Sequence, residues 1–366
     1  MKPNRDLLII GANPSKEKKQ HPGGMITATR ELISYLNSND ILYNVIDTSQ
    51  NSFPRSSKFK KFIDALKRIK KIKKLLREYN FKSALVFSTD GLGFFEKILL
   101  ALILEYKNVP TMFFVRSGRF IHQVNNSKIF KKIVVFLFSK VSYVAHQGGL
   151  WNNFYKKLDI NPSKLYKFLN WIEIKETPKK KFRKVKDSGL VFLYVGWLIE
   201  EKGIQELVEI IVENEVLKKH TFIFAGSGTL FKDINNYIKK NNIKNIILKG
   251  WLSQEEVAEE YKNADVFIFP SHLEGFPNVV LEALNYRLPI ITTNVGGVSE
   301  SVINNFNGYV IEPKQKNDLF KAIMSISDNE KKRIKFSNNT QSILKDNHNV
   351  ESNCKKLLEV LKIKTS

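Results

Sequence analysis

The sequence predicts an α/β protein with two doubly wound domains, each built on a parallel sheet. Strand-sized apolar runs alternate with segments of helical period along the chain. A charged, aperiodic stretch interrupts this alternation once, and the alternation then restarts. The chain has 366 residues, 43% of them hydrophobic, which is more than one core usually organises. We therefore expect two domains.

The first half shows a strand–helix–strand rhythm. The runs DLLIIGA, ILYNVID and SALVFS, at residues 6–12, 41–47 and 83–88, have the length and composition of buried strands. Residues 25–37 and 59–79 lie between them and repeat apolar positions with helical period. This order predicts βαβ units and a parallel sheet.

The stretch KETPKKKFRKVKDSG combines a proline with many charges and no apolar period, which is typical of a linker. We place the domain boundary within it, near Thr177, and predict domains at residues 1–176 and 177–366. The last helix is a segment that can cross back to the first domain.

The second half restarts the rhythm with six further apolar runs. They are GLVFLYVG (189–196), TFIFAG (221–226), NIILKG (245–250), DVFIFPS (265–271), PIITT (289–293) and GYVIEP (308–313). Runs this uniformly apolar are typical of parallel strands that helices cover on both faces. In such sheets, ligands bind at the loops that follow the carboxyl ends of the strands.

One of these loops opens the stretch PSHLEGFPNVVLEAL, in which two acids stand eight positions apart. Glu274 precedes a predicted helix that begins at Pro277 or Asn278, and Glu282 lies within that helix. The helix N-terminus between them favours anions, and Gly275 allows close approach to the main chain. The layout is carboxylate, phosphate site, carboxylate.

A nucleotide-sugar matches this layout, with sugar hydroxyls at one end, a diphosphate in the middle and ribose hydroxyls at the other. Each Glu taken alone is more often a solvated surface acid, so the joint context carries the hypothesis. A pair of acids such as Glu274 and Glu282 could also suggest glycoside hydrolysis. In this interpretation, however, both acids bind ligand hydroxyls, and no second pair of acids flanks a glycosidic bond that could be cleaved.

The stretch resembles the E-x7-E motif of retaining, family 4 type glycosyltransferases (glycosyltransferases group 1). The segments VGWLIEEKGIQELVEI, FAGSGTL, GWLSQEEVAEEYKNADVFIFPS, LPIITTNVGGVSE and NGYVIEP resemble the carboxyl-terminal domain of that family over roughly residues 189–313, in the expected order. HPGGMITATREL resembles its first glycine-rich loop, and FLNWIE the strand end before its linker. The resemblance implies the GT-B fold, in which two Rossmann-like domains face a cleft.

Residue roles follow from the resemblance. It implies that Glu274 and Lys202 are catalytic, with Glu274 bound to the donor sugar hydroxyls and Lys202 to the phosphates, and that Glu282 binds ribose. Further donor-binding positions are Gly196, Trp197, Gly226, Gly275, Phe276, Pro277 and Asn278.

This chain departs from the family at one phosphate-binding position, because Trp197 stands where the family usually has arginine. Arg116, at the end of a predicted strand and near where relatives carry histidine, is a candidate catalytic cation or else an ordinary loop arginine. Gly23 and Gly24 either allow the donor or acceptor to approach the main chain closely, or form a plain turn.

No cofactor or metal is expected, and a nucleotide-sugar, UDP-linked rather than GDP-linked, is the expected co-substrate. GANPSK lacks the dinucleotide-binding glycine spacing, and GSGTL lacks the Lys-Ser/Thr pair of a P-loop. The chain has no Asp-x-Asp pair, and its six histidines lack zinc-ligand spacing. The single cysteine, Cys354, and the absence of a signal or spanning segment suggest the cytoplasm.

The net charge of +23 suits an anionic partner, although an AT-rich genome also explains part of it. Residues 55–82 form a predicted cationic amphipathic helix. We expect its apolar stripe to pack on the sheet, and its charged face to hold the protein at an anionic membrane. Nucleic acid is the less favoured partner, since no recognition motif is present.

The sequence thus predicts a retaining glycosyltransferase that transfers a hexose or hexosamine from a nucleotide-sugar to a glycan or polyprenyl-linked acceptor. Capsule, O-antigen or lipopolysaccharide-type assembly at the inner face of the plasma membrane is the expected setting. The alternatives are a nucleotide-sugar epimerase on the same fold and an inactive basic binding protein.

Overall fold

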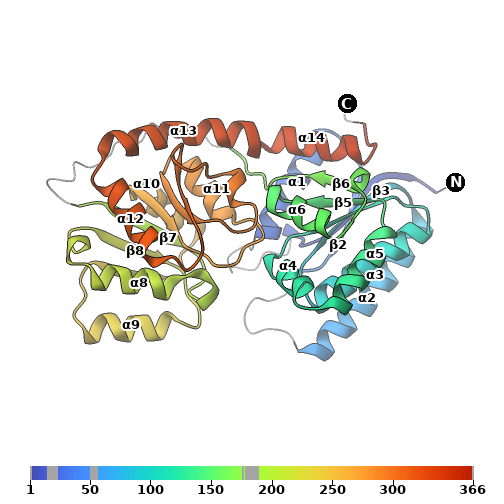
Figure 1. Cartoon of the computed structure of the whole chain (residues 1–366). Helices are drawn as coiled ribbons and strands as arrows, with labels where there is room; N and C mark the ends of the chain where they lie inside the picture. Colours follow the sequence, from blue (N-terminus) through green and yellow to red (C-terminus); the bar gives the residue numbers. More distant parts are fainter. Residues whose placement is uncertain (1, 15–23, 50–56, 175–176, 178–188, 365–366) are drawn as a thin grey trace. The chain divides into compact units, whose positions relative to one another are not determined.

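The computed structural model describes residues 2–14, 24–49, 57–174, 177 and 189–364 (Figure 1). The chain forms two compact units. Unit 1 comprises Met1–Glu173 and Asn349–Ser366, and unit 2 comprises Ile174–His348. This division lies close to the predicted boundary near Thr177. The predicted domain 177–366 included the last residues, whereas Asn349–Ser366 groups with unit 1.

Unit 1 is built on six parallel strands in the order β2-β1-β3-β4-β5-β6. The strands are β1 (Asn4–Gly11), β2 (Tyr43–Asp47), β3 (Asn80–Ser88), β4 (Thr111–Val115), β5 (Tyr143–His146) and β6 (Leu165–Lys167). The helices are α1 (Gly24–Ser38), α2 (Lys58–Glu78), α3 (Leu92–Tyr106), α4 (Gly118–Asn125), α5 (Lys128–Ser139), α6 (Gly149–Lys157) and the carboxyl-terminal α14 (Val350–Val360).

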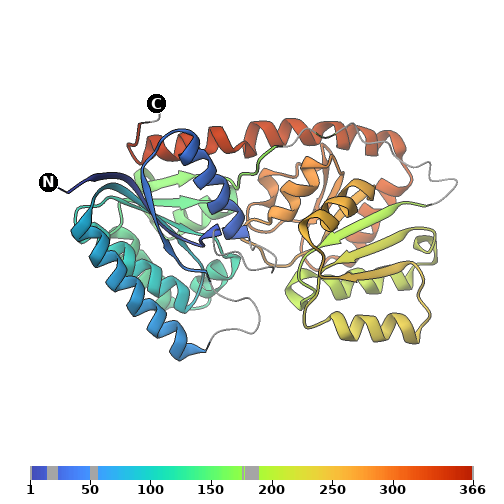
Figure 2. The ribbon, with the colours of Figure 1, turned by 180° about the vertical axis from the view of Figure 1, so that it is seen from behind.

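Helices cover both faces of the sheet of unit 1 (Figures 1 and 2), and a hydrophobic core lies on each face. On one face, α2 to α6 pack through residues such as Ile72, Ile98 and Val134. On the other face, α1 and α14 pack through residues such as Leu32 and Leu357. Helix α14 therefore completes the core of unit 1, although it comes at the end of the chain.

Unit 2 repeats this architecture with strands in the order β12-β11-β10-β7-β8-β9, also parallel. The strands are β7 (Val191–Val195), β8 (Thr221–Ala225), β9 (Ile246–Gly250), β10 (Val266–Phe269), β11 (Ile290–Thr293) and β12 (Gly308–Ile311). The helices are α8 (Ile204–Glu213), α9 (Phe231–Lys240), α10 (Gln254–Asn263), α11 (Asn278–Asn285), α12 (Lys316–Ser327) and α13 (Glu330–His348). The predicted fold class, two doubly wound parallel sheets, is confirmed.

Local sequence explains why these elements form. Each residue of the VFLYV and VFIF strands is buried, because helices cover both faces of the sheet. Helix α10 begins with a capping box, in which Ser253 and Glu256 bond each other's backbone N–H groups.

The predicted packing of the cationic helix is half right. In α2, Ile72 is fully buried, and Ile69 and Leu76 pack against the same core. Phe59 and Phe62, in the first turns, are instead 74% and 62% exposed. The amino-terminal half of the stripe does not pack on the sheet. Among the described residues, no helix is long and apolar enough to span a bilayer.

Candidate functional site

The strand order of unit 2 reverses between β7 and β10. After β7 the chain adds β8 and β9 on one side, and then returns to place β10 on the other. The loops that follow β7 and β10 therefore diverge from neighbouring strand ends, which is where open α/β sheets bind ligands. The two stretches predicted to hold the donor, VGWLIEEK and SHLEGFPN, are these two loops.

Gly203 lets the loop after β7 approach the loop after β10. Its φ is +67°, and a Cβ atom there would stand 2.1 Å from the carbonyl oxygen of Pro270, so only glycine fits. His272 N and Ser271 Oγ both donate to the carbonyl oxygen of Glu201, at 2.8 and 3.1 Å. The two loops are thus joined by hydrogen bonds to one main-chain carbonyl group.

Lys202 and Glu274 meet where the loops touch. Lys202 Nζ donates to Glu274 Oε1 in an ion pair, and the side chains are only 17% and 11% exposed. Lys202 Nζ also lies 5.4 Å from the centroid of the Phe269 ring. The structure brings together these two predicted catalytic residues, which are far apart in sequence.

Helix α11 begins directly after this pair. Pro277 is the N-cap and Asn278 the first helical residue, as predicted. Gly275 and Phe276 are buried before it, and Gly297 N donates to Gly275 O at 2.9 Å. The positive end of the α11 dipole therefore lies beside the Lys202–Glu274 pair, where it favours a negatively charged group.

Glu282 lies in the second turn of α11 and is half-buried. Tyr261, from α10, donates its hydroxyl hydrogen to Glu282 Oε2 at 3.1 Å. Burial raises the pKa of Glu282, and the Tyr261 hydrogen bond opposes that rise because it stabilises the carboxylate. Tyr261 therefore orients this acid.

Two tryptophans lie at the ends of β7 and β9. The rings of Trp197 and Trp251 meet edge to face, with centroids 4.5 Å apart, and the residues are 38% and 44% exposed. Gly226, at the end of β8, lies between them in the sheet, and its N–H donates to Gly250 O at 2.8 Å. Trp251 was not predicted. The repeated Gly-Trp-Leu triplet after two strands, VGWL and KGWL, is the signal that identifies it.

The remaining predicted site residues belong to unit 1. Arg116 follows β4, and its guanidinium lies 5.4 and 5.3 Å from the ring centroids of Phe87 and Phe114. Its Nη2 donates to Asn170 Oδ1 at 2.6 Å. Burial lowers the pKa of Arg116 to about 9, so the group stays charged at neutral pH. Gly24 is the first residue of α1, whereas Gly23 lies outside the described residues.

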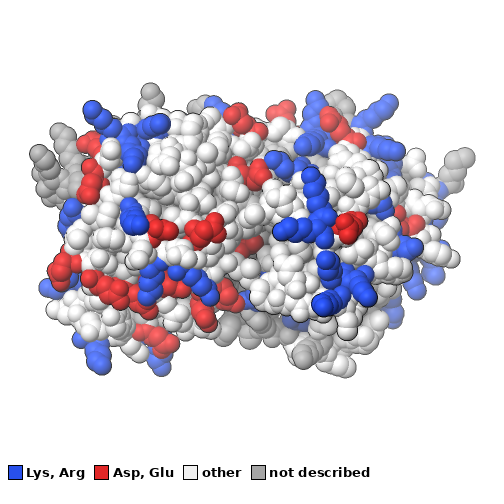
Figure 3. Space-filling view, in the orientation of Figure 1, with Lys and Arg blue, Asp and Glu red and all other residues white. Residues whose placement is uncertain are grey.

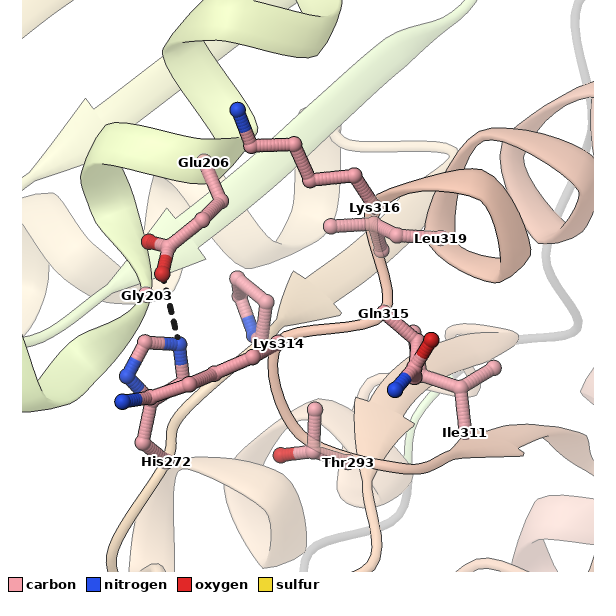
Figure 4. Close-up of a pocket in the computed structure, with 10 residues that line it drawn as sticks. Gly203, Glu206, His272, Thr293, Ile311, Lys314, Gln315, Lys316 and Leu319 are labelled. Carbon is pink, nitrogen blue, oxygen red and sulfur yellow. Dashed lines mark ion pairs between the residues drawn. The ribbon is translucent and has the colours of Figure 1, made fainter.

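A small pocket adjoins the loop after β7 (Figure 4). Gly203, His272 and Thr293 line it, together with lysines 314 and 316 from the segment that follows β12. Here His272 Nε2 lies 3.1 Å from Glu206 Oε1, a further tie between the loop after β10 and α8. The described residues contain no group of three His, Cys, Asp or Glu side chains that could hold a metal.

Comparison with known proteins gives a family match. Residues 175–343 match the family model described as glycosyl transferases group 1. Over 196 residues the chain is 29% identical to the UDP-Gal:alpha-D-GlcNAc-diphosphoundecaprenol alpha-1,3-galactosyltransferase of Escherichia coli, an alignment that covers 50% of each chain. Over 148 residues it is 35% identical to the capsular polysaccharide biosynthesis glycosyltransferase CapM of Staphylococcus aureus, covering 40% of this chain and 37% of the relative.

These alignments span half or less of the length of either relative. Among solved structures, the sucrose-phosphate synthase of Thermosynechococcus elongatus superposes with a TM-score of 0.80, covering 98% of both chains at 16% identity. The fold predicted from the resemblance, two Rossmann-like domains of the GT-B type, is confirmed.

Proposed function

Residues 175–343 form a domain of the glycosyl transferases group 1 family, and on this premise we propose that the protein is a retaining glycosyltransferase with a UDP-sugar donor. Its acceptor is a glycan or a polyprenyl-linked sugar in the assembly of a cell-surface polysaccharide. The names of the two relatives support this choice, since one acts on a diphosphoundecaprenol-linked sugar and the other in capsule biosynthesis.

The Lys202–Glu274 pair is the observation that carries the proposal. An ammonium group has three N–H donors, so Lys202 can bond a donor phosphate while it keeps Glu274 in place. Glu274 then accepts hydrogen bonds from sugar hydroxyls, and Glu282 Oε1 accepts one from the ribose. The diphosphate lies against the N-terminus of α11, at the main chain of Gly275 to Asn278.

The transfer needs no covalent enzyme intermediate. The acceptor hydroxyl oxygen bonds to the anomeric carbon of the donor, and the bond from that carbon to the phosphate oxygen breaks. The acceptor proton passes to an oxygen of the departing diphosphate, so atoms and charge balance. Lys202 and the α11 dipole stabilise the negative charge that develops on that diphosphate, and no metal is required.

Further residues are proposed to bind ligands. The exposed rings of Trp251 and of Trp197, which stands at the position of the family arginine, give the nucleobase a surface for stacking. Gly196 and Gly226 follow β7 and β8 and are proposed main-chain contacts of the donor; a Cβ at Gly226 would stand 1.8 Å from the carbonyl oxygen of Gly196, so glycine keeps these two strand ends close together. In unit 1, Arg116 is the proposed cation for a negatively charged ligand group, and Gly24 is a proposed point where a ligand approaches the main chain.

We place the enzyme in the cytoplasm, peripheral to the inner face of the plasma membrane, because a polyprenyl-linked acceptor is held there. The basic helix α2 supplies attraction to the anionic lipid surface.

A thermal-shift screen with UDP, GDP and ADP, followed by assay of the matching nucleotide-sugars, tests the proposal. We expect UDP to raise the unfolding midpoint of the wild type, and Glu282→Ala and Lys202→Ala to abolish that rise. Lys262→Ala is the matched control, because Lys262 also pairs with a glutamate but lies exposed on α10.

The product of the assay decides between the remaining functions. Transfer to an added glycan with retained anomeric configuration supports the glycosyltransferase. Conversion of the donor sugar without transfer indicates an epimerase. Failure of every nucleotide to bind contradicts the donor site and leaves a basic binding protein.

A further inference from the structure

Helices α2, α3 and α5 of unit 1 each expose a stripe of apolar side chains. The exposed fractions are 74%, 62% and 44% for Phe59, Phe62 and Leu66 on α2, 68%, 41% and 48% for Leu92, Phe95 and Leu99 on α3, and 74%, 38% and 61% for Ile129, Ile133 and Phe136 on α5. On each helix the second residue of the stripe follows the first by three or four positions, and the third follows the first by seven. Residues with this spacing lie on one side of an α-helix.

The three stripes belong to one surface. All three helices pack on the same face of the sheet of unit 1 and lie side by side (Figures 1 and 2). An ion pair between Arg68 and Glu96 joins α2 to α3, and Phe95 lies 5.6 Å from Phe130, between ring centroids, which joins α3 to α5. Because their buried sides face the sheet, the stripes face away from it. We call these nine residues the apolar face.

The most exposed residues of the apolar face lie at one edge of the sheet. Phe59, Leu92 and Ile129 each stand in the first turn of their helix. Each helix leads within a few residues into a strand of the parallel sheet, so it runs back along the sheet and begins at the edge where the strands end. Arg116, at the carboxyl end of β4, belongs to the same edge.

Positive charge accompanies the apolar face. Helix α2 carries ten Lys and Arg against two acidic residues, and α5 carries three lysines and no acid. The two acids of α3 are engaged elsewhere, Glu96 with Arg68 and Lys97, and Glu105 with the backbone of Thr111 and Ser142. By contrast, acidic side chains form a band over α8 of unit 2 (Figure 3).

We propose that the apolar face docks on an anionic phospholipid bilayer, with Phe59, Leu92 and Ile129 inserted among the head groups and the lysines of α2 and α5 on lipid phosphates. A second copy of the chain is a poor partner, because it would bring two sets of like charges together. The docking depends on the proposed function in one respect: its purpose is access to a lipid-linked acceptor.

Vesicle sedimentation tests this surface. We expect the wild-type protein to sediment with vesicles of phosphatidylglycerol and phosphatidylcholine, and not with phosphatidylcholine alone. The triple variant Phe59→Ser, Leu92→Ser, Ile129→Ser should need about tenfold more lipid for half-maximal binding, or still more. Tyr106→Ser is the matched control, because Tyr106 is 81% exposed but stands at the last residue of α3, at the opposite edge. It should bind like the wild type.

Two further measurements keep the result interpretable. The thermal midpoint of the triple variant should equal that of the wild type, because the three side chains are exposed, and UDP in vesicle-free buffer should raise both midpoints equally. If the protein binds anionic vesicles as expected but does not bind UDP, the docking proposal stands and the transferase proposal fails. The docking is overturned if the wild type ignores anionic vesicles, if Tyr106→Ser loses as much binding as the triple variant, or if light scattering shows that the triple variant merely splits a dimer.

Discussion

Replacing Tyr261 by phenylalanine removes the hydroxyl that orients Glu282 and keeps the buried ring. The hydroxyl lies 3.1 Å from Glu282 Oε2 and 3.2 Å from the Val279 carbonyl oxygen. A hydrogen bond to a charged acceptor contributes about 1.5–3 kcal/mol to stability, and one to a neutral acceptor about 0.5–1.5 kcal/mol. The loss should therefore depend on whether Glu282 is ionised.

The sign of the pH dependence follows from the direction of the pKa shift. Burial raises the folded-state pKa of Glu282 above its ordinary value of 4.5. A carboxyl group of this kind contributes stability below the unfolded pKa, and this contribution is lost as the pH rises through the folded pKa. Tyr261 reduces that loss because it stabilises the carboxylate. Tyr261→Phe should then cost about 2 kcal/mol near pH 7.5 and about 1 kcal/mol near pH 4.

Calorimetric unfolding at the two pH values measures this difference. For a unit of this size, 1 kcal/mol corresponds to about 2–4 °C in the unfolding midpoint. Tyr286→Phe is the control, because its ring stacks on Tyr261 at 5.3 Å between centroids, whereas no hydrogen bond joins its hydroxyl to Glu282. Equal losses for Tyr261→Phe at both pH values would refute the assigned role of Tyr261.

Three other substitutions or modifications test single features. Gly203→Ala should lower the free energy of unfolding in urea by about 3 kcal/mol, because its Cβ would meet Pro270 O. Gly250→Ala is the control and should lower it by about 1 kcal/mol, because Gly250 has a φ of +68° but no atom within 4 Å of its Cβ position. Similar losses for the two variants would contradict the close loop contact. Trp251→Ala should weaken UDP binding about tenfold by titration calorimetry, and unchanged affinity would exclude stacking on this ring. Cys354, whose thiol pKa is raised by burial, should resist a disulfide reagent until unit 1 unfolds, and rapid native labelling would contradict its burial.

Sequence patterns predicted the strands well, because each is a short apolar run in a sheet that is covered on both faces. The loop PSHLEGFPN was also predictable, since Pro277 and Asn278 have strong preferences for a helix start. The packing of Cys354 and its helix α14 was harder to predict, because the contacts of α14 with α1 join opposite ends of the chain. No local pattern states on which sheet such a helix packs.

The functional contacts that could not be predicted are those between distant residues. Lys202 and Glu274 were each predicted, but their ion pair depends on the strand order of unit 2, which places β7 beside β10. The exposure of Phe59 and Phe62 was missed for a similar reason. Apolar spacing shows that they share a side of α2, but not that this side is exposed in the first turns of the helix.

Hydrogen exchange of the full chain with and without UDP tests the donor site most directly. We predict slower exchange in the segments 196–203 and 270–282 when UDP is bound, with the Lys202→Ala variant showing no change there. Slower exchange in α2 instead, at residues 58–78, would mean that UDP binds through the general positive charge of this helix, and would contradict the assignment of the site to Lys202 and Glu274.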